Sequence, residues 1–211
     1  MSTTLYQPRH FKVDELAHAL DVMLAHPFAT LLTLTDGAPV VSHLPLHVRR
    51  IGETLELVGH VAKPNPHGAL ADGAEATAIF HGGNAFISPR CYTTREAVPT
   101  WNYIVVHASG RLRRVDDSAG KELILKTLID RHDPAYRAQW DDELSEAYRE
   151  RMKRGIVGLV LEVERVQAKF KLSQNRDPAD QQGVLEAMTR GDEAARQLGQ
   201  WMRRLGLGAP P

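Results

Sequence analysis

The stretch FATLLTLTDGAPVVSHLPLHVRRIGETLELVGH (residues 28–60) decides the fold of this chain. Three runs rich in apolar and β-branched residues predict strands, at residues 28–35, 38–48 and 54–60. Asp36-Gly37 and Gly52-Glu53 separate these runs and are typical of tight turns. Pro45 lacks a backbone N–H group, so the middle strand needs a sheet edge or a bulge there. Consecutive hairpins of this kind predict an antiparallel sheet.

Strands and helices continue on both sides of this stretch. Further strands are predicted at residues 76–80, 85–89, 100–114 and 156–172, the last with a bend near Arg165. Apolar residues at helical spacing predict helices at residues 13–25, 117–131, 141–154, 178–190 and 192–205, and a short helix follows KPNPHG (63–68). This order favours the α+β class with a small antiparallel barrel. We expect one domain over residues 1–205 and a disordered tail over residues 206–211.

Charge and cysteine content limit the class of protein. Lys and Arg together number 26, as do Asp and Glu, so the formal net charge is zero. Proteins that coat DNA usually carry a basic excess, and the chain has no helix-turn-helix pattern, so we expect no specific binding of duplex DNA. One cysteine, no secretory signal and no apolar run of about 20 residues predict a cytoplasmic protein without a membrane segment.

Familiar cofactor and catalytic motifs are absent. The sequence has no G-x-G-x-x-G after a strand, no Walker loop and no C-x-x-C pair. His43 and His47 flank Pro45, and a strand would place both rings on one face, but no third ligand follows at a useful spacing. Barrel-lining or surface histidines are therefore favoured over a metal site. Cys91 has no histidine–acid pattern beside it, so we predict no nucleophile there.

The segment HVAKPNP (60–66) directly follows a predicted strand. Lys63 offers a positive charge, and Asn65 offers an amide near the start of a short helix. Free backbone N–H groups at such a start suit an anion. A proline-rich turn with a solvated lysine is the alternative interpretation.

Two later segments also carry groups suited to a flat, polar ligand. VPTWNY (98–103) combines an indole with an amide on a strand, although an ordinary core tryptophan has the same pattern. KFKLSQN (169–175) places Lys169 and Lys171 on one face of a strand end, before a run of polar side chains. That combination suits a phosphate or a carbonyl-rich ring. A capped strand end is the alternative.

Seven segments together resemble, in order and spacing, the PaiB-type family of FMN-binding negative transcriptional regulators. They are YxPxHF (6–11), HPFATLLT (26–33), HLPL (43–46), GHVAKPNP (59–66), ISP (87–89), VPTWNY (98–103) and KFKLSQNR (169–176). The resemblance covers roughly residues 5–190. It implies an FMN-binding split β-barrel, and a homodimer with the flavin at the subunit interface.

The resemblance also implies roles for individual residues. Lys63 and Asn65 would hold the FMN phosphate. Residues of the first two strands would approach the ring or the ribityl chain, namely Thr30, Thr33, His43 and Pro45. Trp101 and Asn102 would contact the other side, from the partner subunit. The predicted cofactor-binding set also includes His60, Lys169, Lys171, Ser173 and Gln174.

The chain departs from the family pattern at two positions. Cys91 stands where the family commonly has tryptophan, and Lys63 stands where it often has arginine. Lysine keeps the charge of arginine but loses its bidentate fork. We therefore expect weaker flavin binding than in relatives.

Three functions remain open from the sequence. A flavin-linked regulator is the first, and a flavin-dependent oxidoreductase acting on a small molecule is the second, since one fold hosts many functions. No acid–base constellation is evident for a reaction. A haem-binding barrel is the third, with His60 or His107 as the iron ligand.

Overall fold

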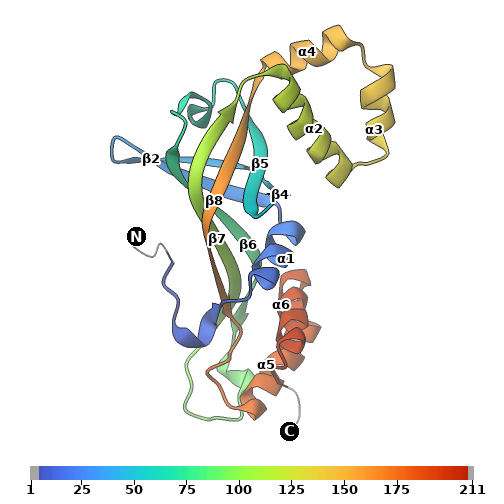
Figure 1. Cartoon of the computed structure of the whole chain (residues 1–211). Helices are drawn as coiled ribbons and strands as arrows, with labels where there is room; N and C mark the ends of the chain where they lie inside the picture. Colours follow the sequence, from blue (N-terminus) through green and yellow to red (C-terminus); the bar gives the residue numbers. More distant parts are fainter. Residues whose placement is uncertain (1–4, 209–211) are drawn as a thin grey trace. The chain divides into compact units, whose positions relative to one another are not determined.

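The computed structural model describes residues 5–208 and has the predicted α+β composition (Figure 1). An antiparallel sheet has the strand order β3-β2-β6-β7-β8-β5-β4, and the short β1 pairs with β8. Contacts between Cα atoms divide the chain into two compact units. Unit 1 contains residues 1–22, 81–107 and 167–211, and unit 2 contains residues 23–80 and 108–166. Within residues 5–208 no helix is long and apolar enough to cross a membrane.

Unit 2 begins with the hairpins that the sequence predicts. The strands are β2 (Phe28–Thr35), β3 (Ala38–Pro45), β4 (His47–Ile51) and β5 (Thr54–Ala62). Asp36 and Gly37 both have positive φ, 52° and 79°, as a tight two-residue hairpin turn requires. This turn fixes the β2–β3 register, in which Thr35 pairs with Ala38 and Phe28 pairs with Pro45.

The predicted second strand is in fact two strands. Pro45 ends β3 and His47 begins β4, so the run over residues 38–48 is interrupted at Leu46. The backbone N–H of Leu46 donates to the carbonyl of Pro27 at 2.9 Å instead of continuing the ladder. Proline at the end of an edge strand leaves no ladder donor missing, which explains its place here.

The remainder of unit 2 joins long strands to a helical segment. The strands β6 (Ala74–Ile87), β7 (Thr100–Val115) and β8 (Ile156–Lys171) each contribute residues to both units. Between β7 and β8 come α2 (Ser118–His132), α3 (Tyr136–Ala138), a π-helical turn (Gln139–Glu143) and α4 (Glu146–Arg154). Val58, Val115, Ile124 and Val160 form a buried cluster that attaches α2 to the strands.

A central carboxylate holds this helical segment together. Glu122 of α2 accepts a hydrogen bond from the Trp140 indole at 2.8 Å and pairs with Lys153 of α4 at 2.9 Å. Burial alone would raise the pKa of Glu122, but these two partners outweigh it and lower the pKa below its usual value. The segment is therefore closed by charge-assisted contacts between α2 and α4.

Unit 1 packs a helical hairpin against strand ends. Its elements are η1 (Arg9–Phe11), β1 (Lys12–Val13), most of α1 (Leu16–Ala25), η3 (Pro89–Cys91), α5 (Pro178–Arg190) and α6 (Glu193–Arg204). Asp177 and Asp192 are the N-caps of α5 and α6. The carboxylate of each accepts a hydrogen bond from the backbone N–H three residues later, as is usual for Asp at an N-cap. The Phe170 ring meets Trp201 of α6 edge-on, with ring centroids 4.8 Å apart.

The two strands predicted at residues 76–80 and 85–89 are one strand, because β6 continues through Gly82 and Gly83 to Ile87. The glycines serve close approach instead. A Cβ on Gly83 would lie 2.5 Å from the Ala194 carbonyl oxygen of α6. Glycine here lets α6 pack directly on the strand.

The chain end was predicted to be disordered from residue 206. Residues 206–208 form a turn after α6, in which the N–H of Leu207 donates to the Met202 carbonyl at 2.8 Å. Residues 209–211 lie outside the described part of the chain. The single domain expected over residues 1–205 stays a prediction.

Candidate functional site

One face of the β2–β3 hairpin in unit 2 is apolar and open. Side chains that alternate along the two strands share this face, which we call the hairpin face: Phe28, Thr30, Leu32, Leu34, Pro39, Val41, His43 and Pro45. Phe28 is 65% exposed, Leu34 69% and Val41 49%. An exposed apolar face of this kind marks a site of binding or association.

A polar pair lies within the hairpin face. Thr30 and His43 are opposite each other in the register, and the Thr30 hydroxyl lies 3.1 Å from Nδ1 of His43. Both belong to the sequence-predicted cofactor set, and Pro45 ends the same face. The face therefore offers apolar surface with one hydroxyl–imidazole pair, which suits a flat heterocycle with polar edges.

A buried network fixes the loop that follows β5. Asn65 caps η2 (Pro66–Ala69), since its side-chain oxygen accepts from the backbone N–H of His67 at 2.9 Å. The Asn65 amide nitrogen donates to the Ser42 hydroxyl of β3 at 2.9 Å. The resemblance predicts that Asn65 holds the FMN phosphate. In the structure the hydrogen bonds of its side chain hold the loop against β3.

His67 is the centre of this network and is fully buried. Its Nδ1 lies 2.8 Å from the Ser42 hydroxyl, and its Nε2 lies 3.3 Å from the hydroxyl of Thr33 on β2. Thr33 was predicted to approach the cofactor. Its side chain is instead buried and faces His67. Burial lowers the pKa of His67, so the ring is neutral at neutral pH.

Lys63 lies at the exposed end of this fixed loop. Its backbone N–H donates to the Gly155 carbonyl at 2.9 Å, which holds the main chain in place. Its side chain is exposed and, within residues 5–208, has no carboxylate partner. A free cation on a rigid loop is what recognition of an anion requires.

His60 occupies a different setting on β5. Its ring is half-buried, and Nδ1 is enclosed without a hydrogen-bond partner. Burial lowers the pKa of His60. An enclosed nitrogen without a partner is a rare state, so a ligand group or a water that reaches Nδ1 would remove a desolvation penalty.

In unit 1, Trp101 is the exposed member of the predicted set. Its indole is 54% exposed and meets the ring of Phe86 edge-on, with centroids 5.9 Å apart. Asn102, the next residue, is fully buried and donates to the Ser173 hydroxyl at 3.0 Å. Ser173 has a positive φ of 67°, an uncommon conformation for serine that this hydrogen bond helps to hold. Trp101 is thus available to a ligand, whereas Asn102 and Ser173 bind each other.

The other polar side chains of KFKLSQN also have contacts within the protein. Gln174 accepts from the N–H of Leu172 at 2.7 Å and donates to the Phe170 carbonyl at 2.6 Å, so it closes the end of β8. Lys171 donates to the Thr100 hydroxyl. Lys169 is buried between tyrosine rings.

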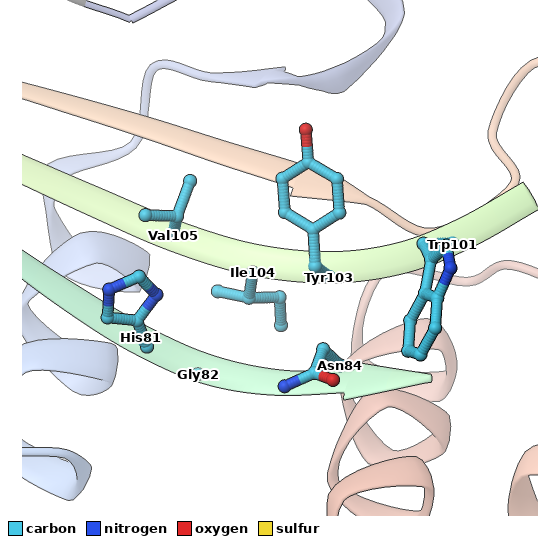
Figure 2. Close-up of a pocket in the computed structure, with 7 residues that line it drawn as sticks. All are labelled: His81, Gly82, Asn84, Trp101, Tyr103, Ile104 and Val105. Carbon is cyan, nitrogen blue, oxygen red and sulfur yellow. The ribbon is translucent and has the colours of Figure 1, made fainter. Parts of the chain in front are cut away.

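Unit 1 also contains a cavity of about 350 Å³ between β6 and β7. Figure 2 shows Trp101 and Asn84 toward one end and His81 and Val105 toward the other. Tyr103, Ile104 and Gly82 complete the lining. Aromatic and apolar walls with a few polar groups are typical of small-molecule sites.

Several of these residues were not predicted from the sequence. Ser42, His67, His81, Asn84 and Tyr103 were not among the predicted site residues. The KPNPHG segment contained His67, and VPTWNY contained Tyr103, but nothing in the spacing distinguished them from neighbours. His81 and Asn84 flank the glycine pair, which lay between the two predicted strands at residues 76–80 and 85–89.

His43 and His47, which were predicted to lie on one face of a strand, have different surroundings in the structure. His43 faces outward to Thr30, whereas His47 is buried and lies 3.2 Å from Nε2 of His132. Burial, with His132 and Arg131 nearby, lowers the pKa of His47 to about 4. In residues 5–208 no group of three or more His, Cys, Asp or Glu side chains is placed to hold a metal. His107, one of the two haem candidates, has an enclosed Nδ1 without a hydrogen-bond partner.

The His67 network predicts a measurable pH effect. Because the folded-state pKa of His67 is below its usual 6.5, the unfolded chain binds the extra proton first. Stability is then lost as the pH falls below about 6.5. His67→Gln should lower the free energy of unfolding by about 1 kcal/mol at pH 7.5, and it should lose less than the wild type between pH 7.5 and 5.5.

Urea unfolding at the two pH values measures both effects. His81→Gln is the matched control, because His81 is exposed. Equal acid sensitivity of His67→Gln and wild type would show that His67 is not the titrating group.

Comparison with known proteins identifies the family. Residues 5–165 match the family model described as "Putative FMN-binding domain". The chain is 34% identical over 189 residues to Protease synthase and sporulation protein PAI 2 of Bacillus subtilis, covering 87% of this chain and 89% of that protein. An uncharacterized protein of Emericella nidulans is 27% identical over 183 residues, covering 71% of this chain and 73% of that protein.

Solved structures agree on the fold. The FAD and haem binding protein of Mycobacterium smegmatis has a TM-score of 0.59 and 22% identity, covering 76% of this chain and 73% of that one. The flavocytochrome Anf3 of Azotobacter vinelandii has a TM-score of 0.60 and 15% identity, covering 80% and 74%. The split-barrel α+β fold and the family resemblance predicted from the sequence are both confirmed. The chain therefore belongs to the PaiB-like family of FMN-binding-domain proteins.

Proposed function

We propose that the protein binds FMN on the hairpin face of unit 2, with the phosphate on Lys63 and its loop. The carrying observation is the hydrogen-bonded chain from Asn65 through Ser42 to His67, which fixes that loop to β3. Two residues before this anchor, Lys63 presents an ammonium group that has no carboxylate partner among residues 5–208. The family membership supports a flavin as the anion that uses it.

The hairpin face fits the isoalloxazine ring. Leu32 and Val41 are cross-strand neighbours and offer apolar surface, and next to them Thr30 and His43 offer a donor–acceptor pair. A flat ring with carbonyl and N–H edges needs both kinds of contact. FMN, when bound, supplies electron and hydride transfer, while the residues named here bind and orient it.

A homodimer would cover the part of the hairpin face that the flavin ring leaves exposed. Phe28, Leu34 and Val41 expose apolar side chains along the hairpin face, and β3 is an edge strand. A second copy related by two-fold symmetry is the usual cover for such a surface. In this arrangement the exposed Trp101 of the partner subunit is available to contact the flavin.

We assign the bound flavin a regulatory role rather than a dedicated enzymatic one. The Bacillus subtilis relative is named Protease synthase and sporulation protein PAI 2, and a protein named for sporulation is consistent with regulation. A flavin-dependent oxidoreductase remains the alternative, and it would require turnover of an electron donor.

Reconstitution tests this proposal. Protein mixed with excess FMN and passed through a desalting column should retain the flavin absorption band near one FMN per chain. Reduction of bound FMN by NADH or NADPH, followed by turnover with a small-molecule acceptor, would instead support the oxidoreductase.

A further inference from the structure

Lys169 is a buried lysine with an unusual environment in unit 1. The residue is 6% exposed, although it carries an ammonium group. Its Nζ lies 5.1 Å from the centroid of the Tyr6 ring and 5.2 Å from that of Tyr103. Two aromatic faces therefore contact the charge, in the range typical of cation–π interactions.

The charge of Lys169 has no counterion in the described part of the chain. Within residues 5–208 no carboxylate lies within 4.0 Å of Nζ, and no side-chain or backbone oxygen accepts from it. Lys12 is directly opposite Lys169 in the β1–β8 register, so the two residues share a face of the sheet. Asp14 neutralises Lys12 at 2.5 Å, which leaves Lys169 uncompensated.

A second unpaired cation lies on the same face. Lys171 is two residues further along β8, and alternation places it on the side of Lys169. Within residues 5–208 its ammonium group donates to the hydroxyl of Thr100 and has no acidic partner. The end of β8 thus concentrates positive charge that the described residues do not balance.

A buried ammonium group without a counterion is energetically unfavourable unless a bound anion balances its charge. Removing an ammonium group from water is unfavourable, and contact with aromatic faces compensates for that only in part. An ammonium group also has three donors, which the faces of aromatic rings do not satisfy as oxygen atoms do. An anion at this position would supply both the missing charge and the missing acceptors.

The two tyrosines beside Lys169 border solvent and a neighbouring cavity. The Tyr6 side chain covers Lys169 from the solvent side but is itself 81% exposed. Tyr103 is shared, because it also lines the cavity of about 350 Å³ between β6 and β7. In Figure 2 the Tyr103 ring extends from β7 toward β8, the strand that carries Lys169.

We infer that Lys169, flanked by Tyr6 and Tyr103, is the anchor of a binding site for a small carboxylate- or phosphate-bearing molecule other than FMN. Lys171 adds to the attraction from the same face, and the aromatic rings restrict the site to a compact anionic group. The inference stands apart from the proposed flavin site, since every residue named belongs to unit 1 and protection by phosphate or benzoate is measured on flavin-free protein.

Chemical labelling of the wild-type protein tests the site directly. Trace acetylation with acetic anhydride, read by mass spectrometry, gives the labelling rate of Lys169 and of Lys12 in the same sample. Inorganic phosphate or benzoate at saturating concentration should slow labelling of Lys169 at least threefold and change that of Lys12 little. The stronger protector tells whether the site prefers a phosphate or a carboxylate.

A variant provides the second measurement. Lys169→Met should weaken binding of the protecting anion, followed by calorimetry, about tenfold or more, since charge-assisted contacts have that magnitude. Lys12→Met, on the same face with its charge already paired, should change it less than twofold. If Lys169→Met does not fold, the labelling experiment on the wild type decides alone.

Two results would overturn the inference. Equal protection of Lys169 and Lys12 would show a general salt effect instead of a site. Protection by FMN, with neither phosphate nor benzoate protecting, would assign Lys169 to the flavin and remove the separate site.

Discussion

Replacing Lys63 with alanine should weaken FMN binding about tenfold or more while leaving riboflavin binding almost unchanged. FMN differs from riboflavin by its phosphate, and the proposed contact is a charge-assisted one of roughly 1.5–3 kcal/mol. The side chain is exposed on a loop that Asn65 anchors, so its loss should leave the fold intact. Quenching of flavin fluorescence gives both dissociation constants.

Two further variants sharpen this prediction. Lys63→Arg should bind FMN at least as tightly as the wild type, because a guanidinium group keeps the charge and adds a bidentate fork. Lys12→Ala removes the same charge from unit 1 and should change FMN affinity less than twofold. Equal weakening of FMN and riboflavin by Lys63→Ala would place the phosphate elsewhere.

Replacing Val41 with glutamate should dissociate the proposed dimer and weaken FMN binding with it. Val41 is 49% exposed at the centre of the hairpin face, between Pro39 and His43. A carboxylate buried there in an interface without a partner costs several kcal/mol, which raises the dimer dissociation constant about 100-fold or more. Light scattering at micromolar concentration should give two chains of 23.5 kDa for the wild type and one for the variant.

Ile51→Glu is the matched control for this change. Ile51 is also β-branched and 56% exposed, but it ends β4 instead of lying on the hairpin face. It should remain dimeric and bind FMN as the wild type does. A monomeric wild-type protein would refute the two-chain arrangement, and with it any contribution of Trp101 from a partner.

Local patterns predicted much of the fold. Asp36-Gly37 has the positive φ values that a tight hairpin turn needs, and the strands on either side follow from it. Apolar residues at helical spacing likewise predicted the two last helices to within one residue of their observed ends. These signals depend on neighbours in the sequence, which is why they could be read without a structure.

Long-range packing could not be predicted in the same way. Gly82 and Gly83 have the composition of a turn, yet they lie within β6, where Gly83 allows the close approach of α6. His67 looked like an ordinary loop residue, and only the fold brings Ser42 and Thr33 to its two nitrogens. Asn102 and Ser173 are 71 residues apart, so their hydrogen bond could not be foreseen either. The sequence identified the segments that are rich in hydrogen-bond donors. Which of these donors remain available to a ligand depends on contacts between residues far apart in the chain.

Titration of the wild-type protein with FMN, followed by quenching of flavin fluorescence, tests the central claim most directly. The account predicts saturable binding with a dissociation constant in the micromolar range or below, and a stoichiometry of one FMN per chain. Riboflavin should bind at least tenfold more weakly, because it lacks the phosphate that Lys63 would hold. Failure to saturate at tens of micromolar FMN, a concentration at which a useful cofactor site should be filled, would contradict it.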